Sequence, residues 1–298
     1  MRILLCLLAA LVIPATAGAF ESRNLVLTHD GLERQVLIDA QRDVQAAPML
    51  VVLHGGIAGP RFVRRRARVT LAREGWVVAW PYAVDDWNDG RVDSDGTPYD
   101  AADDVGFLRA MIADLAGRGM VDPNKVFFAG PSIGGVMTLR MLCEAPDLVA
   151  GAAVAIASFA RGYTCPAGPP KPVLYIHGTD DGIMLPDGGR IGGWNPLVRD
   201  RGWVEPVADT VAKLARRNGC TGREETALAD LDPDDDSTVR RQTYQGCAEP
   251  LVHFIVDGGG HTWPGAAASP MGRIVGATNK DFSATQAVQT FFQRIAGE

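Results

Sequence analysis

The residue best placed for chemistry in this 298-residue chain is Ser132, which stands in the sequence Gly-Pro-Ser-Ile-Gly at positions 130–134. A serine hydroxyl is a weak nucleophile unless it is held exposed beside a base. A sharp turn from a strand into a helix holds it in that way, and the flanking glycines let the helix approach the strand closely. An apolar run at 125–129 precedes the motif and a helical pattern at 133–142 follows it. This context favours a nucleophilic serine over a structural serine in a glycine-rich turn.

The general base that such a serine needs would be one of the five histidines of the chain. His261 lies in a glycine-rich segment, 257–264, that follows the last apolar strand pattern. Sites of open α/β sheets form in this place, beyond the carboxyl ends of the strands. We therefore predict His261 as the base. The other histidines are expected to have structural places in a turn, in a strand or at strand ends: His29, His253, His54 and His177.

The acid that orients the histidine should lie between Ser132 and His261, because open α/β sheets with such a triad carry it in the order Ser, Asp or Glu, His. Asp180 and Asp181 follow the strand pattern that ends at His177, at the same edge of the sheet. The acid keeps the imidazole in its productive tautomer and stabilises the imidazolium. Successive side chains of an extended segment point to opposite sides, so only one of the two carboxylates can readily face His261.

Two backbone N–H groups are predicted to stabilise the oxyanion that forms when the serine attacks a carbonyl carbon. Ile133 follows the nucleophile directly and supplies one of them. The second should come from the loop after the strand that ends at Leu53, where Gly56 is the best-placed residue. A single donor of this kind is typically worth about 10²–10³ in rate.

The elements that must position these groups follow from the apolar patterns. Two alternating runs, 24–28 and 34–38, flank Asp30-Gly31 and predict a β-hairpin. Short strands are predicted at 49–53, 76–80, 125–129, 149–156, 173–176, 239–244 and 252–256. Helices are predicted at 62–73, 99–115, 133–142, 204–217 and 285–295. This alternation indicates an α/β fold, with a mostly parallel twisted sheet and helices on both faces.

The first nineteen residues are predicted to be a signal peptide that is not part of the fold. Arg2 is followed by an apolar run at 3–13 and by Ala17-Gly18-Ala19, the order of a leader with a small-residue cleavage site. The run is shorter than the about 20 apolar residues that span a bilayer, which disfavours an uncleaved anchor. We expect residues 20–298 to form a single catalytic domain that is secreted or periplasmic, with no membrane contact after cleavage.

Four of the five cysteines lie after the leader, and an even number in an exported chain suggests two disulfides. Sequence order favours Cys143–Cys165 and Cys220–Cys247, because each pair closes a local loop. The other pairings and four free thiols are the alternatives. A zinc site is disfavoured, because the short C-x₂₋₄-C spacing of such sites is absent.

The overall charge argues against nucleic acid as a partner, because the formal net charge is −6 and such binding needs clustered positive charge. One basic cluster is expected to be the solvated face of a short helix: Arg61, Arg64, Arg65, Arg66 and Arg68. The acidic stretch 230–236 lacks the mid-loop glycine and closing glutamate of a calcium loop, so it is predicted to be a surface loop. Neither a metal nor a cofactor is expected.

Six short motifs occur in one order along nearly all of the mature chain. They are Leu53-His54-Gly55-Gly56, Trp87-Asn88-Asp89-Gly90, Asp103-Asp104-Val105-Gly106-Phe107, the Ser132 motif, His177-Gly178-Thr179-Asp180-Asp181 and Gly258-Gly259-Gly260-His261-Thr262-Trp263-Pro264-Gly265. Together they resemble the polyhydroxybutyrate depolymerase and feruloyl esterase group of exported α/β-hydrolases. The resemblance implies the α/β-hydrolase fold and hydrolysis of a small or oligomeric carboxylic ester without metal or cofactor. It also implies that the acid is Asp181, the fourth residue after His177, and that Cys220 pairs with Cys247.

Departures from the family pattern leave the substrate open. The loop at 57–60 contains less glycine than the usual form, and Pro131 and Ile133 stand where relatives often have other residues. Three tryptophans lie near the motifs and could stack on a sugar or feruloyl ring: Trp87, Trp194 and Trp263. Trp87 and Trp263 are the candidate substrate-binding residues. Packing in the core is the alternative for these side chains. The competing functions are a serine peptidase or acyltransferase on the same fold, and a catalytically inactive binding protein.

Overall fold

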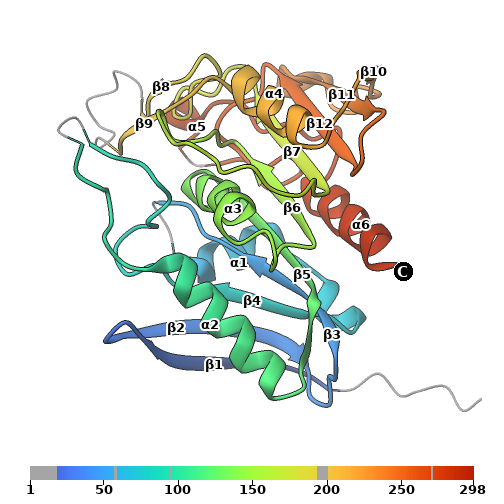
Figure 1. The fold of residues 1–298 in the computed structure, drawn as a ribbon. Coiled ribbons are helices and arrows are strands. Elements are labelled where there is room, and N and C mark those ends of the chain that lie inside the picture. The colour runs from blue at the N-terminus through green and yellow to red at the C-terminus, as the bar shows by residue number, and fades with distance from the viewer. Residues whose placement is uncertain (1–18, 57–58, 94–95, 193–200, 270) are drawn as a thin grey trace, which may run out of the picture.

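The computed structural model describes residues 19–56, 59–93, 96–192, 201–269 and 271–298. The predicted leader lies outside these residues except for Ala19, and Trp194 lies outside them too. Figure 1 shows a large twisted sheet that runs through the molecule, with helices on both sides of it.

Ten strands of the described chain form this sheet. Their spatial order is β1 (Phe20–His29), β2 (Leu32–Gln41), β4 (Val77–Pro81), β3 (Ala47–Val52), β5 (Val121–Pro131), β6 (Gly151–Ala155), β7 (Val173–Gly178), β12 (Leu251–Asp257), β11 (Thr238–Gln245) and β10 (Gly222–Ala227). The run from β4 to β12 is parallel, and antiparallel strands extend it at both edges. Parallel strands between two helical layers are buried on both faces, which explains their continuous apolar sequences.

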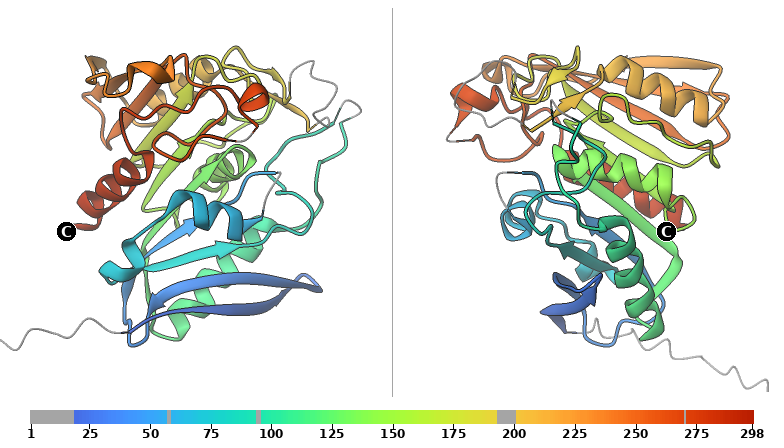
Figure 2. Two further views of the ribbon diagram at one scale, coloured as in Figure 1. Left: turned by 180° about the vertical axis from the view of Figure 1, so that it is seen from behind. Right: turned by 60° about the vertical axis from the view of Figure 1, so that its left-hand side comes forward.

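Helices cover both faces of the sheet, as predicted. They are α1 (Pro60–Ala67), α2 (Asp104–Gly117), α3 (Ile133–Glu144), α4 (Val207–Arg217) and α6 (Ala284–Ala296). In Figure 1, α2, α3 and α4 lie over the near face, and the view from behind in Figure 2 shows α1 and α6 over the other. Each face has its own apolar core: Phe107 and Met137 belong to the first, and Phe127 and Phe292 to the second.

Most predicted elements are confirmed, with four local corrections. The helix predicted from 204 begins only at Val207, because Trp203 and Val204 form the short strand β9 (Trp203–Val204) and Pro206 precedes the helix. The predicted helix at 62–73 ends at Ala67, because Arg68 has a left-handed backbone with φ 49°, and a separate 3₁₀ turn follows at Leu71–Glu74. The helix predicted from 99 begins only at Asp104, since the side chain of Asp103 caps it there. β10 has no counterpart among the predicted strands, because all its side chains are exposed and no apolar alternation marks it.

The cysteines form the two pairs that sequence order favours. Cys143 in α3 joins Cys165, and Cys220 after α4 joins Cys247 after β11, with Cα–Cα distances of 5.2 and 4.0 Å. The acidic stretch 230–236 lies at the surface. None of the helices in the described part of the chain combines the length and apolar character that crossing a membrane requires.

Candidate active site

Ser132 lies at the sharp turn between β5 and α3, and its backbone is strained. The values φ 56° and ψ −134° are rare for a residue with a side chain. The two glycines of the motif allow the close approach of helix and strand: a Cβ on Gly130 would lie 2.2 Å from the Gly134 carbonyl oxygen, and one on Gly134 would lie 2.2 Å from that of Leu53. The Ser132 side chain does not cap α3, so its hydroxyl is left for another partner.

That partner is His261. Its Nε2 lies 3.0 Å from Ser132 Oγ, and its Nδ1 lies 2.7 Å from Oδ2 of Asp181. When Nδ1–H donates to the carboxylate, Nε2 has a lone pair that can accept the proton of the hydroxyl. The three residues are 129 and 80 positions apart in the chain, so the sheet brings together what the sequence separates.

Asp181 and Asp180 have different surroundings. Asp181 Oδ1 accepts hydrogen bonds from the backbone N–H groups of Ile183 and Met184 at 2.9 and 2.8 Å, which leaves Oδ2 for the histidine. Only 3% of Asp181 is exposed. Asp180 is exposed, and its Oδ1 accepts from the hydroxyl of its neighbour Thr179 at 3.3 Å. The structure therefore brings Asp181 to His261.

The loop that carries His261 is held through its backbone. Gly260 N–H donates to Ala277 O at 3.0 Å, and His261 N–H donates to Val275 O at 2.5 Å. Val275 ends the short helix α5 (Gly272–Val275), which sequence patterns do not predict. A segment that follows the histidine in the chain thus fixes the position of its backbone.

The two predicted oxyanion donors lie close together beside Ser132. Ile133 is the first residue of α3, where a backbone N–H has no acceptor within the helix. The N-terminus of a helix also carries partial positive charge, which suits a developing oxyanion. A Cβ on Gly55 would lie 3.4 Å from Ser132 Cβ, and one on Gly56 would lie 3.0 Å from Ile133 Cδ1. The loop after β3 therefore borders Ser132.

Side chains anchor the carbonyl groups of this loop. Trp87 Nε1 donates to His54 O at 2.9 Å. His54 Nε2 accepts from the N–H of Ala83 at 3.1 Å, so the proton belongs on Nδ1, which donates to Gly55 O at 2.9 Å. Burial lowers the pKa of His54 below its ordinary value and so favours the neutral ring that both bonds require.

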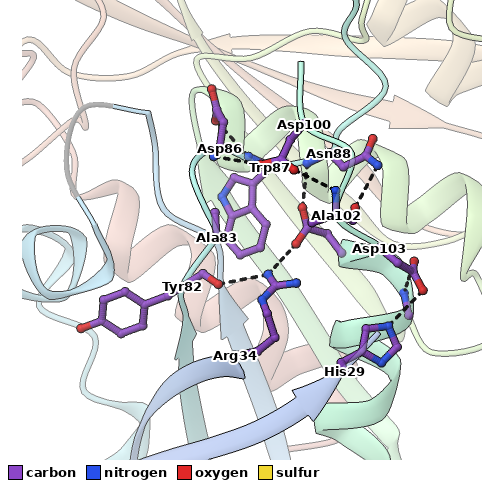
Figure 3. Close-up of polar contacts among 12 residues, drawn as sticks. His29, Arg34, Tyr82, Ala83, Asp86, Trp87, Asn88, Asp100, Ala102 and Asp103 are labelled. Atoms are coloured by element: carbon purple, nitrogen blue, oxygen red, sulfur yellow. Dashed lines mark hydrogen bonds and ion pairs between the residues drawn. The ribbon is translucent and has the colours of Figure 1, made fainter. Parts of the chain in front are cut away.

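Trp87 is in turn held by a buried polar network that links the N-terminal hairpin to α2 (Figure 3). Arg34 of β2 donates to Asp104 Oδ1 at 2.6 Å, and the side chains of this pair are 2% and 0% exposed. The other oxygen of Asp104 accepts the N–H of Asn88 at 2.7 Å. The motif around Trp87 and the motif around Asp104 thus form one support for the loop beside the nucleophile.

The two tryptophans expected to bind substrate both make packing contacts, and for Trp263 a role in substrate binding stays a prediction. Trp87 is fully buried, so the prediction that its ring stacks on a substrate is wrong. Trp263 is half-buried, its ring packs against the apolar core under α6, and its Nε1 donates to Thr285 Oγ1 at 3.0 Å. Thr285 in turn donates to Ala67 O at 2.5 Å. Trp263 therefore ties the histidine loop to α6 and α1.

Sequence reasoning did not single out two arginines that lie near this site. Arg201 Nη2 donates to Gly56 O at 2.8 Å, and the fully buried Arg91 pairs with Asp89. Arg91 stands next to the Trp87 motif, whereas Arg201 belongs to no motif. No three His, Cys, Asp or Glu side chains within the described ranges are grouped so that they could hold a metal ion.

Comparison with known proteins finds esterases. NocK of Nocardia uniformis subsp. tsuyamanensis, named as an esterase, is 31% identical over 264 residues, which cover 83% of this chain and 74% of that protein. Feruloyl esterase B of Piromyces equi is 29% identical over 195 residues, which cover 60% of this chain but only 34% of that longer protein. No family model matches the chain.

A solved structure shares the fold. The acetyl xylan esterase from Aspergillus awamori superposes with a TM-score of 0.54 over 80% of this chain and 94% of that one, at 17% identity. At this identity the likeness shows the architecture alone, which is the α/β-hydrolase fold that the sequence motifs imply.

Proposed function

This chain belongs to the feruloyl esterase-like group of esterases and is a carboxylic ester hydrolase of the serine hydrolase type, and on this premise we propose that it acts through a triad of Ser132, His261 and Asp181. The observation that carries the proposal is the pair of hydrogen bonds that joins the three side chains, at 3.0 and 2.7 Å. A nucleophile bonded to a base that a third group orients is the arrangement that activates a serine.

The proposed reaction has two halves. Ser132 Oγ attacks the ester carbonyl carbon while His261 Nε2 takes the hydroxyl proton, and the N–H groups of Ile133 and Gly56 receive the oxyanion. His261 then gives that proton to the leaving alcohol as the C–O bond breaks, which leaves an acyl group on Ser132. A water molecule attacks this acyl group while His261 takes its proton, and His261 then returns that proton to Ser132 Oγ as the acyl–serine bond breaks and the carboxylic acid departs. Asp181 stays ionised throughout and holds the ring.

The substrate is proposed to be a small or oligomeric carboxylic ester. One relative is named as a feruloyl esterase, and a feruloyl ester is therefore one candidate. A ferulate ring would need a contact other than Trp87, which is buried. We also propose that residues 20–298 act as one catalytic domain, exported behind the leader at 1–19, and the two disulfides support export because such bonds persist in oxidising compartments.

The nucleophile is tested with Ser132→Ala. A fluorophosphonate probe should label the wild-type protein and fail to label the variant, because the probe reacts with an activated serine hydroxyl. Turnover should be lost in the same variant on a panel of p-nitrophenyl acyl esters, feruloyl esters and hydroxybutyrate oligomers. The matched control is Ser283→Ala, which removes the serine that caps α6 and should keep both labelling and turnover. Labelling of folded Ser132→Ala at the wild-type rate would refute the assignment.

A further inference from the structure

The guanidinium of Arg201 lies directly against the loop that carries the second candidate oxyanion donor. Its Nη2 donates to the Gly56 carbonyl oxygen at 2.8 Å. Its Nη1 lies 2.0 Å from the point that a Cβ on Gly56 would occupy, and Ile133 Cδ1 lies 3.0 Å from the same point. Gly56 is therefore enclosed between Arg201 and the residue that follows Ser132.

Arg201 is itself held by charged groups from the loop after β4. Its Nη1 donates to Asp86 Oδ2 at 3.0 Å. Its backbone carbonyl accepts from Arg91 Nη1 at 2.5 Å, and Arg91 Nε lies 2.8 Å from both oxygens of Asp89. The side chains of Arg91 and Asp89 are fully buried, and that of Arg201 is 21% exposed. A hydrogen-bonded network of this kind gives the guanidinium a fixed position.

A hydrogen bond from a fixed side chain matters in this loop because glycine restricts the backbone little. Gly55 and Gly56 are consecutive glycines, and glycine has the greatest backbone freedom of any residue. Three successive carbonyl groups, those of His54, Gly55 and Gly56, each accept a side-chain hydrogen bond. Because a peptide unit is planar, restraining a carbonyl also restrains the N–H on the other side of that peptide bond. The bond to Gly55 O therefore restrains the N–H of Gly56, which belongs to the same peptide unit. The Arg201 bond to Gly56 O holds the following peptide unit, so Gly56 is fixed from both sides.

We propose that Arg201 is a positioning residue for the oxyanion hole, which holds Gly56 in place across 145 residues of chain. The inference rests on the proposed function, since it assumes a tetrahedral intermediate at Ser132. Oxyanion donors are effective because they are aimed before charge develops. Loss of the Arg201 contact therefore weakens binding of the transition state more than binding of the ester, and the effect falls on kcat.

The experiment compares Arg201→Ala with Arg109→Ala. Arg109 also donates two hydrogen bonds, both to Asp147, but this pair lies on the surface with side chains 44% and 60% exposed, next to the end of α3 opposite Ser132. Arg201→Ala should lower kcat about 10- to 100-fold, up to the cost of losing one oxyanion donor, with KM changed less than about threefold. Arg109→Ala should retain both constants. Added guanidinium ion should restore part of kcat to Arg201→Ala, and Arg201→Lys should recover little, because an ammonium cannot reach both Gly56 O and Asp86 in a planar fork.

A second variant keeps the test decisive if Arg201→Ala does not fold. Asp86→Asn retains Arg201 but removes the charge that orients it, so kcat should fall in the same sense, by less. The proposal is overturned if folded Arg201→Ala has the wild-type kcat. If only Asp86→Asn folds, a wild-type kcat in that variant overturns it in the same way. A variant in which KM alone changes also overturns the proposal. These results differ from failure of the proposed function, in which Ser132→Ala would keep turnover whatever Arg201 does.

Discussion

Two adjacent carboxylates follow β7 in different surroundings, and we propose different roles for them. Asp181 is buried, and two backbone N–H groups hold one of its oxygens while the other faces His261. Asp180 points its carboxylate to solvent, although its backbone N–H donates to Gly259 O at 2.9 Å. A carboxylate contributes to a triad only where it orients the imidazole, so position and not residue type separates the two.

The acid is tested with a pair of isosteric variants. Asp181→Asn should reduce kcat by about 10⁴, because an amide no longer holds His261 in the tautomer that accepts the serine proton. Asp180→Asn should reduce kcat by less than about tenfold, since substitutions of exposed side chains are usually mild. Steady-state kinetics on one ester provides the measurement, with circular dichroism to show that both variants fold. A crippled Asp180→Asn beside an active Asp181→Asn would reverse the assignment.

At the scale of elements, the hairpin β1–β2 is linked to the site by buried charge rather than by apolar packing alone. Arg34 lies 3.9 Å from the Phe107 ring centroid while it pairs with Asp104, so its charge meets both the face of a ring and a carboxylate. Asp104 also holds the N–H of Asn88, and the neighbouring Trp87 holds the loop beside Ser132. A substitution in the hairpin can therefore alter the position of the loop that carries Gly56, through the side chains of Asp104 and Trp87.

The prediction at this scale concerns Arg34→Met. It should lower the free energy of unfolding by about 3–5 kcal/mol, because removing one partner of a buried ion pair leaves the Asp104 charge buried without compensation. The matched control is Arg118→Met, which breaks a pair with Asp114 whose side chains are 55% and 29% exposed. Exposed ion pairs contribute about 0–1 kcal/mol to stability, so the control should have a free energy of unfolding close to that of the wild type. Urea unfolding measures both, and equal losses in the two variants would contradict the role given to burial.

At the scale of the whole molecule, the neighbouring strands β7 and β12 each carry a buried histidine. His177 Nδ1 and His253 Nε2 lie 2.7 Å apart, with ring centroids 4.8 Å apart. Burial lowers the pKa of His177 to about 4, although the nearby carboxylates of Asp181 and Asp257 oppose the shift. Burial also lowers the pKa of His253 well below its ordinary value, and the positive charges of Arg223 and Arg240 add to this.

The stability of the fold should therefore depend on pH. Between about pH 6.5 and pH 4 the unfolded chain binds protons at these histidines that the folded chain does not, so the free energy of unfolding falls as the pH falls. At 1.36 kcal/mol per pKa unit, His177 alone accounts for a loss on the order of 3 kcal/mol. Urea unfolding at a series of pH values measures the slope. His253→Gln should show a shallower slope than wild type, and an unchanged slope would exclude His253 as a contributor.

Several features follow from short segments of the chain. The order of strands and helices, the turn at Ser132 and the glycine-rich loop of His261 are each encoded within about ten residues, through apolar period, glycine and the residues that end an element. The choice of Asp181 over Asp180 came from the resemblance of the six motifs to the esterase family. The same local information misjudged Trp87 and gave no sign of β10, because burial of an aromatic ring and pairing of a polar strand depend on what lies opposite.

What the tertiary structure alone decided is how distant loops meet at the site. Parallel pairing of β7 with β12 brings the loops of Asp181 and His261 to one edge of the sheet. This pairing places the Asp181 carboxylate within hydrogen-bond distance of the His261 ring. The contact of Arg201 with Gly56 joins irregular segments 145 residues apart. No periodic pattern records such a contact, because an irregular loop has no repeat from which the direction of a side chain follows. The sequence by itself thus predicted the residues that we propose do the chemistry, and the packed fold determined which groups hold them in place.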